Sequence, residues 1–153
     1  MADRARSGFV PRLSIDAACA RYGRRAVIDG CVRLVLTDDN VADYDADARL
    51  IEALGGPPAR ILLDGGPRPD SRYWIRVWAM RGLLWAWDAS ALEAVITGLS
   101  DPAWRVREMS AKVIARHRVG EALSAVADRR DDPVRRVRAA ATRAVAVLTA
   151  AGA

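Results

Sequence analysis

One helical pattern recurs three times in the second half of the chain, at a constant interval of 31 residues, and this period restricts the possible folds more than any other feature. An aspartate opens each copy, an isoleucine or valine follows five residues later, and an arginine comes next. These columns are Asp70, Asp101 and Asp132; Ile75, Val106 and Val137; and Arg76, Arg107 and Arg138. A fixed period of this length is typical of a solenoid, in which stacked units bury their apolar faces against one another.

Each repeat has room for a short helix followed by a longer one. The apolar residues of the longer helix, such as Val106 and Ile114, recur at helical spacing and form one core face. The pairs Asp101-Pro102 and Asp132-Pro133 predict helix starts, because aspartate can accept hydrogen bonds from the free amides of a first turn and proline at the first position loses none. We therefore expect alternating short and long antiparallel helices over residues 69–150.

The pattern Asp-x-x-x-x-Val/Ile-Arg-x-x-Ala/Ser, seen from Asp101 to Ser110 and from Asp132 to Ala141, resembles HEAT-like repeats of the phycobilisome-lyase type. This resemblance implies an all-α fold: a right-handed α-solenoid of HEAT-like helix pairs whose second helices line a concave surface. It also implies a structural ladder between units, formed by Asp70, Arg76, Asp101, Arg107, Asp132 and Arg138. The first copy departs most from the pattern, with Gly82 where Val113 and Ala144 stand later.

The N-terminal part shows helical periodicity without the full repeat pattern. Within a single domain we expect a flexible N-terminus at residues 1–12, a degenerate helical cap at 13–68 and the repeats at 69–150. The expected helices of the cap are two between Leu13 and Leu36 with a break near Gly23, a third from Val41 to Leu54, and a short one that restarts at Pro57-Pro58.

The residue content argues against catalysis and metal binding. His117 is the only histidine, and it shares a repeat column with Ala86 and Leu148, so we expect it to pack against the core. Asp43, Asp45 and Asp47 imitate part of a calcium loop, but its glycine and closing glutamate are missing. We expect no enzymatic activity, no metal and no cofactor.

Two further features bear on location. The two cysteines are too few for a disulfide framework, which favours a reducing cytoplasm. No apolar run approaches the roughly 20 residues of a membrane span, so we expect a protein that does not bind membranes.

The formal net charge of +5 lies in the repeats, since acidic and basic residues balance before residue 69. Helical spacing places many of the basic residues on one face together with three tryptophans. Tryptophan and arginine are frequent anchors of interfaces. The candidate binding surface consists of Trp74, Trp78, Arg81, Trp85, Arg105, Met109, Lys112, Arg116, Arg136 and Arg143.

Three functions fit this surface. The leading hypothesis is a non-enzymatic interaction module that binds an acidic segment of a partner protein on its concave Trp/Arg surface. The alternative is nucleic-acid binding, as in the HEAT-like alkylpurine DNA glycosylases, which the repeats resemble in architecture; a third is pigment attachment, as in phycobilisome lyases. A basic row on a helix can also be merely solvated, and the tryptophans can pack under the cap instead of facing a ligand. Three helices about 10 Å apart can contact only a few phosphates of a nucleic acid. We therefore rank a protein partner above nucleic acid.

Overall fold

The computed structural model describes residues 8–65, 68 and 70–151, and within these ranges every regular element is helical. The N-terminal helices are α1 (Pro11–Tyr22), α2 (Arg24–Leu36), α3 (Ala48–Gly55) and α4 (Pro57–Asp64). The remaining helices are α5 (Tyr73–Gly82), α6 (Leu92–Gly98), α7 (Trp104–His117), α8 (Leu123–Asp128) and α9 (Arg135–Ala151). Short 3-10 turns precede α6 (Ala89–Ala91), precede α8 (Gly120–Ala122) and follow α8 (Arg129–Asp131).

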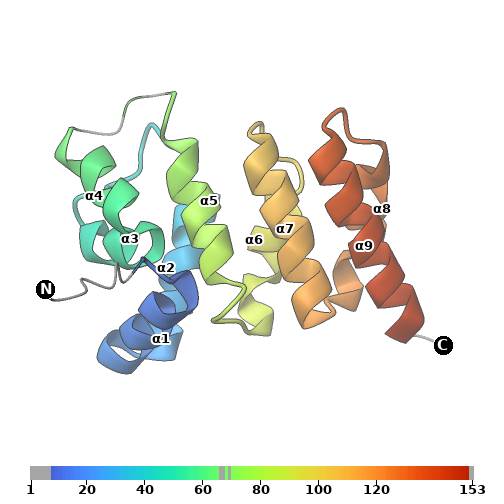
Figure 1. The fold of residues 1–153 in the computed structure, drawn as a ribbon, viewed down its shortest axis with the longest axis horizontal. Coiled ribbons are helices and arrows are strands. Elements are labelled where there is room, and N and C mark those ends of the chain that lie inside the picture. The colour runs from blue at the N-terminus through green and yellow to red at the C-terminus, as the bar shows by residue number, and fades with distance from the viewer. Residues whose placement is uncertain (1–7, 66–67, 69, 152–153) are drawn as a thin grey trace, which may run out of the picture.

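The repeat half consists of two layers of helices. The longer helices α5, α7 and α9 stand side by side, and the shorter helices α6 and α8 lie behind them (Figure 1). Equivalent residues occupy equivalent environments, since Ile75, Val106 and Val137 are all almost fully buried. The period predicted from the sequence is therefore present in the structure as alternating short and long helices.

The expected helix starts were wrong by a few residues. Helices α7 and α9 begin at Trp104 and Arg135, beyond the Asp-Pro pairs. The carboxylate of Asp101 accepts from the amide of Ala103 at 2.8 Å, and that of Asp132 accepts from the amide of Val134 at 2.9 Å. Both amides lie in the turn before the helix, so each aspartate stabilises the approach to the helix and not its first turn.

The N-terminal part follows the sequence prediction in its breaks. Helices α1 and α2 are separated at Gly23, whose φ of 92° favours glycine, and α3 gives way to α4 between Gly55 and Pro57. Helix α1 starts at Pro11, two residues before the expected boundary, because proline is well placed in the first turn of a helix. Of the rest of the expected flexible N-terminus, residues 8–10 have no regular secondary structure and residues 1–7 lie outside the described residues.

The helix expected from Val41 starts only at Ala48. The segment before it forms turns, in which the side chain of Asp38 accepts from the amide of Asn40 at 2.7 Å and that of Asp43 accepts from Ala46 at 3.1 Å. Short acidic side chains that bond to nearby amides compete with helical hydrogen bonds, so this aspartate-rich segment folds as a loop.

Helices α2 and α3 pack closely against α5, and this contact explains why the first repeat departs from the others at Gly82. A Cβ atom at Gly82 would lie 2.9 Å from the sulfur of Cys31 and 2.7 Å from a methyl group of Leu54. The valine or alanine of the later repeats would therefore push α5 away from the N-terminal helices.

Candidate functional site

The arginine column joins successive repeats through carboxylates. Arg76 donates to Asp101 from Nε at 2.7 Å and Nη2 at 3.2 Å, and Arg107 donates to Asp132 from Nε at 2.8 Å and Nη2 at 3.1 Å. Each pair is a bidentate fork, the geometry in which arginine holds a carboxylate most firmly. The Asp/Arg ladder therefore runs from one repeat to the next.

The same arginines also tie down the loop of their own repeat. Arg107 donates from Nη1 to the carbonyls of Asp101 and Pro102 at 2.9 and 3.1 Å, and Arg138 does the same to Asp132 and Pro133 at 2.8 and 3.1 Å. Burial alone would raise the pKa of Asp132, but hydrogen bonds from Arg107 and the Val134 amide hold that pKa below its usual value. Asp132 therefore stays ionised inside the fold.

The first aspartate of the column was assigned to the ladder, and the structure places it elsewhere. Asp70 is exposed and forms no ion pair with any arginine of the ladder. The free side of Arg76 is occupied instead by the carboxylate of Asp39, from the loop that follows α2. In the later repeats, each aspartate pairs with the arginine of the preceding repeat. The position one period before Arg76 is Asp45, so the N-terminal part supplies no equivalent arginine for Asp70.

Two members of the expected binding surface on α5 are turned toward the N-terminal helices. Trp78 is only 6% exposed, and a Cβ atom at Gly55 would lie 2.6 Å from its ring. Arg81 is half-buried and donates from Nη2 to the carbonyl of Leu54 at 2.7 Å. Trp78 is therefore not part of an open surface: it packs under α3 of the cap, which is the alternative that the sequence left open for the tryptophans.

Trp85 lies between two guanidinium groups. The guanidinium carbons of Arg12 and Arg116 are 5.6 and 4.4 Å from its ring centre, and Arg116 also donates from Nε to the carbonyl of Leu84 at 2.7 Å. The indole nitrogen of Trp85 is buried and has no hydrogen-bond partner within the described ranges. This indole is thus a packing element between α1 and α7.

The first turns of α5, α7 and α9 are connected by alternating indole and guanidinium groups. The guanidinium carbon of Arg105 lies 5.1 Å from the ring centre of Trp74 and 4.4 Å from that of Trp104, and that of Arg136 lies 5.4 Å from Trp104. Trp104 is not among the residues of the candidate surface predicted from the sequence. Its repeat column, which holds Tyr73 and Arg135, gave no indication of this contact.

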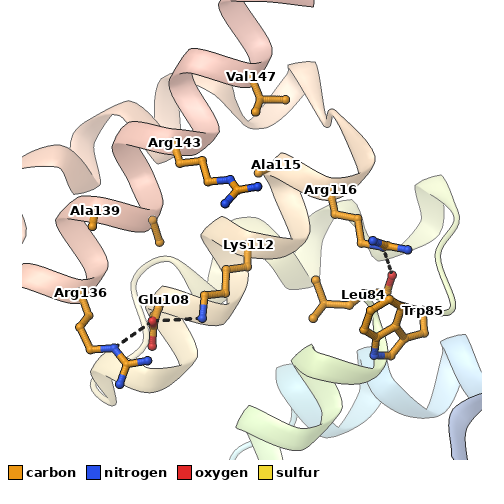
Figure 2. Close-up of a pocket in the computed structure, with 11 residues that line it drawn as sticks. Leu84, Trp85, Glu108, Lys112, Ala115, Arg116, Arg136, Ala139, Arg143 and Val147 are labelled. Carbon is orange, nitrogen blue, oxygen red and sulfur yellow. Dashed lines mark hydrogen bonds and ion pairs between the residues drawn. The ribbon is translucent and has the colours of Figure 1, made fainter. Parts of the chain in front are cut away.

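A groove of about 650 Å³ lies between α7 and α9 and ends at the turn that follows α5. Figure 2 shows the basic side chains that extend into it from both helices. We call it the basic groove; it is lined by Lys112, Arg116, Arg136 and Arg143, by Glu108, and by Leu84, Trp85, Ala115, Ala139, Ala140 and Val147. Met109, also expected on this face, is half-buried against the core and does not line the groove.

Glu108 is the only acidic residue of the groove among the described residues, and it was not expected from the sequence. Its side chain is 11% exposed, and its Oε1 atom lies 3.1 Å from both the Lys112 Nζ and the Arg136 Nε. One carboxylate is therefore shared by two cations. Arg143 forms no hydrogen bond or ion pair with the described part of the chain, and its guanidinium points into the groove (Figure 2).

His117 has the packing role expected for it. It is half-buried, its Nε2 lies 2.8 Å from the carbonyl of Leu83, and its ring stacks on Trp87 with centroids 5.1 Å apart. Burial lowers the pKa of His117, so the ring is neutral near pH 7 and Nε2 carries the proton that it donates to Leu83.

Comparison with known proteins identifies the architecture. A family model described as HEAT repeats matches residues 66–146, which is more than half of the chain, and the chain therefore belongs to the HEAT-repeat family. Repeats of this family are generally protein-interaction modules and typically carry no enzymatic activity. No curated protein and no solved structure matches the chain. Among the described helices, none is both long enough and apolar enough to cross a membrane.

Proposed function

We propose that this chain is a non-enzymatic interaction module that binds an acidic segment of a partner protein in the basic groove. In this proposal α5, α7 and α9 form the concave side of a right-handed solenoid, and α1 to α4 cap its first repeat. The observation that carries the proposal is the charge of the groove, where four basic side chains meet a single carboxylate.

The internal contacts leave a surplus of positive charge. Glu108 balances one of the two cations that share it, Arg116 is engaged by an uncharged carbonyl and an indole, and Arg143 has no ion-pair partner among the described residues. Like charges held close together on one face repel each other, and an acidic segment relieves this repulsion. The small side chains of Ala115, Ala139 and Ala140 leave room for an extended backbone between α7 and α9.

The state of the tryptophans favours a protein partner over nucleic acid. Proteins that hold single strands stack bases on open aromatic faces. Here Trp78 is buried, Trp85 lies between two arginines, and Trp74 lies against Arg105. About four phosphate contacts would give a salt slope near −3.6, so duplex binding at physiological salt would be weak and largely non-specific.

The test is a binding titration with a short fluorescein-labelled peptide of alternating glutamate and glycine, followed by fluorescence anisotropy at physiological salt. Arg143→Glu should weaken binding at least tenfold, because it replaces a cation of the groove by a repelling charge. The matched control is Arg135→Glu, the same charge change on the same helix at an exposed position outside the groove.

The result that supports the proposal is peptide binding that Arg143→Glu weakens and Arg135→Glu leaves nearly unchanged. If both variants lose the same amount of peptide affinity, the effect is explained by net charge alone, and binding in the basic groove is contradicted. A labelled DNA duplex is titrated in parallel. Submicromolar duplex binding at physiological salt that is lost in Arg143→Glu would assign the groove to nucleic acid instead.

A further inference from the structure

A second cavity, of about 950 Å³, lies between α4 and α5, and none of its described lining residues belongs to the basic groove. Its walls are mainly apolar and include Phe9, Ile61, Leu62, Trp74 and Trp78. Ile61 is 75% exposed and Phe9 is 37% exposed, so large apolar side chains at this cavity remain open to solvent. Volumes of several hundred Å³ with apolar walls are typical of small-molecule sites. We call this space the apolar cavity.

Two basic residues line the apolar cavity, the exposed Arg68 and the half-buried Arg81. One amino group of Arg81, Nη2, donates to the carbonyl of Leu54 at 2.7 Å, whereas its Nε is buried without any hydrogen-bond partner in the described ranges. Burial lowers the pKa of Arg81, as expected for a cation that no carboxylate compensates. No aspartate or glutamate is found among the described residues that line the cavity.

The other enclosed arginines of the chain show what Arg81 lacks. Arg76 and Arg107 each hold at least one carboxylate in a bidentate fork. Arg81 instead meets one carbonyl and the ring of Phe9, whose centre is 5.8 Å from the guanidinium carbon. A partly buried guanidinium beside an apolar space therefore has unused capacity to hold an anion.

We propose that the apolar cavity binds a small apolar carboxylate, whose anionic group pairs with Arg81 and whose hydrocarbon part packs against Ile61, Trp74 and Trp78. The carboxylate supplies the missing counter-charge, and the hydrocarbon part covers the apolar side chains that now face solvent. This inference does not rest on the proposed function, because the cavity and the basic groove use different residues.

The probe for this site is decanoate, with 1-decanol as an uncharged molecule of the same chain length, and binding is measured by isothermal titration calorimetry. The wild-type protein should bind decanoate at least tenfold more tightly than decanol, because only the carboxylate pairs with Arg81. Arg81→Met, which removes the charge and keeps a long side chain, should greatly reduce this preference even though the exposed Arg68 remains at the cavity. Arg60→Met is the control, since Arg60 is exposed on α4 and does not line the cavity.

A second variant keeps the test valid if Arg81→Met fails to fold. Ile61→Asp changes a side chain that is 75% exposed and places a carboxylate beside the cavity, which should weaken decanoate binding much more than decanol binding. Equal affinity of the wild-type protein for the two probes, or no binding of decanoate, would overturn the proposal. Arg81→Met should still bind the acidic peptide, so failure of one site is distinguishable from failure of the other.

Discussion

Replacing Arg107 by alanine should remove one complete step of the Asp/Arg ladder. The side chain donates four hydrogen bonds, two to the Asp132 carboxylate and two to carbonyls of its own loop. Arg107 is 9% exposed and Asp132 is 3% exposed, so the variant would leave a carboxylate in a poorly hydrated site. Breaking a buried ion pair typically costs about 3 to 5 kcal/mol.

The full cost is not expected here, because Asp132 keeps other partners. Its carboxylate still accepts from the Val134 amide at 2.9 Å and lies 3.5 Å from Arg129. We therefore expect Arg107→Ala to lower the free energy of unfolding by about 2 to 4 kcal/mol. For a chain of this length, each kcal/mol corresponds to about 3 °C in Tm.

The chain provides a matched control at the equivalent position of the next repeat. Arg138 makes the same two bonds to loop carbonyls but holds no carboxylate within the described residues. Arg138→Ala should therefore cost only about 1 kcal/mol. The assay is urea unfolding followed by circular dichroism, with the slope compared between variants. If Arg107→Ala costs no more than Arg138→Ala, the ladder does not stabilise the stacking of repeats.

Two further predictions concern single positions. Because the pKa of His117 is lowered in the fold, its contribution to stability is complete above the unfolded pKa of about 6.5 and is lost as the pH falls below it. The Tm should fall between about pH 7.5 and 5.5 in the wild type and much less in His117→Gln; equal falls in both would exclude this histidine as the cause. Gly82→Val, which copies the second repeat, should lower the free energy of unfolding by about 2 kcal/mol, because its side chain would meet Cys31 and Leu54. Gly120→Ala, whose added carbon would have no atom of the described residues beyond its own chain neighbours within 4 Å, should change unfolding in urea very little. A Gly82→Val variant as stable as this control would contradict the packing argument.

The architecture of the repeats could be predicted because a period reports directly on equivalent environments. Ile75, Val106 and Val137 share a column and are all buried, and the partners of Arg76 and Arg107 follow the same register. Asp70 lies outside the ladder because its partner would belong to a preceding repeat, and the chain has no arginine at that position. A column predicts a contact only where both neighbouring units are present.

The candidate surface was harder to predict because it depends on non-repeating parts of the chain. Trp78 is covered by α3, whose position no repeat column encodes. The role of Glu108 could not be predicted from the sequence, because a single acidic residue among basic ones forms no recurring pattern. Its importance follows from its distances to Lys112 and Arg136, which only the folded chain defines.

The central claim is that acidic protein segments bind to the face that carries the basic groove. The most direct measurement is a titration of the isotopically labelled protein with the glutamate and glycine peptide, followed by amide chemical shifts in ¹H–¹⁵N spectra. We predict the largest changes at groove residues of α7 and α9, such as Lys112, Ala115 and Arg143. Changes concentrated on α6 (Leu92–Gly98) and α8 (Leu123–Asp128), with the groove residues unaffected, would contradict the account.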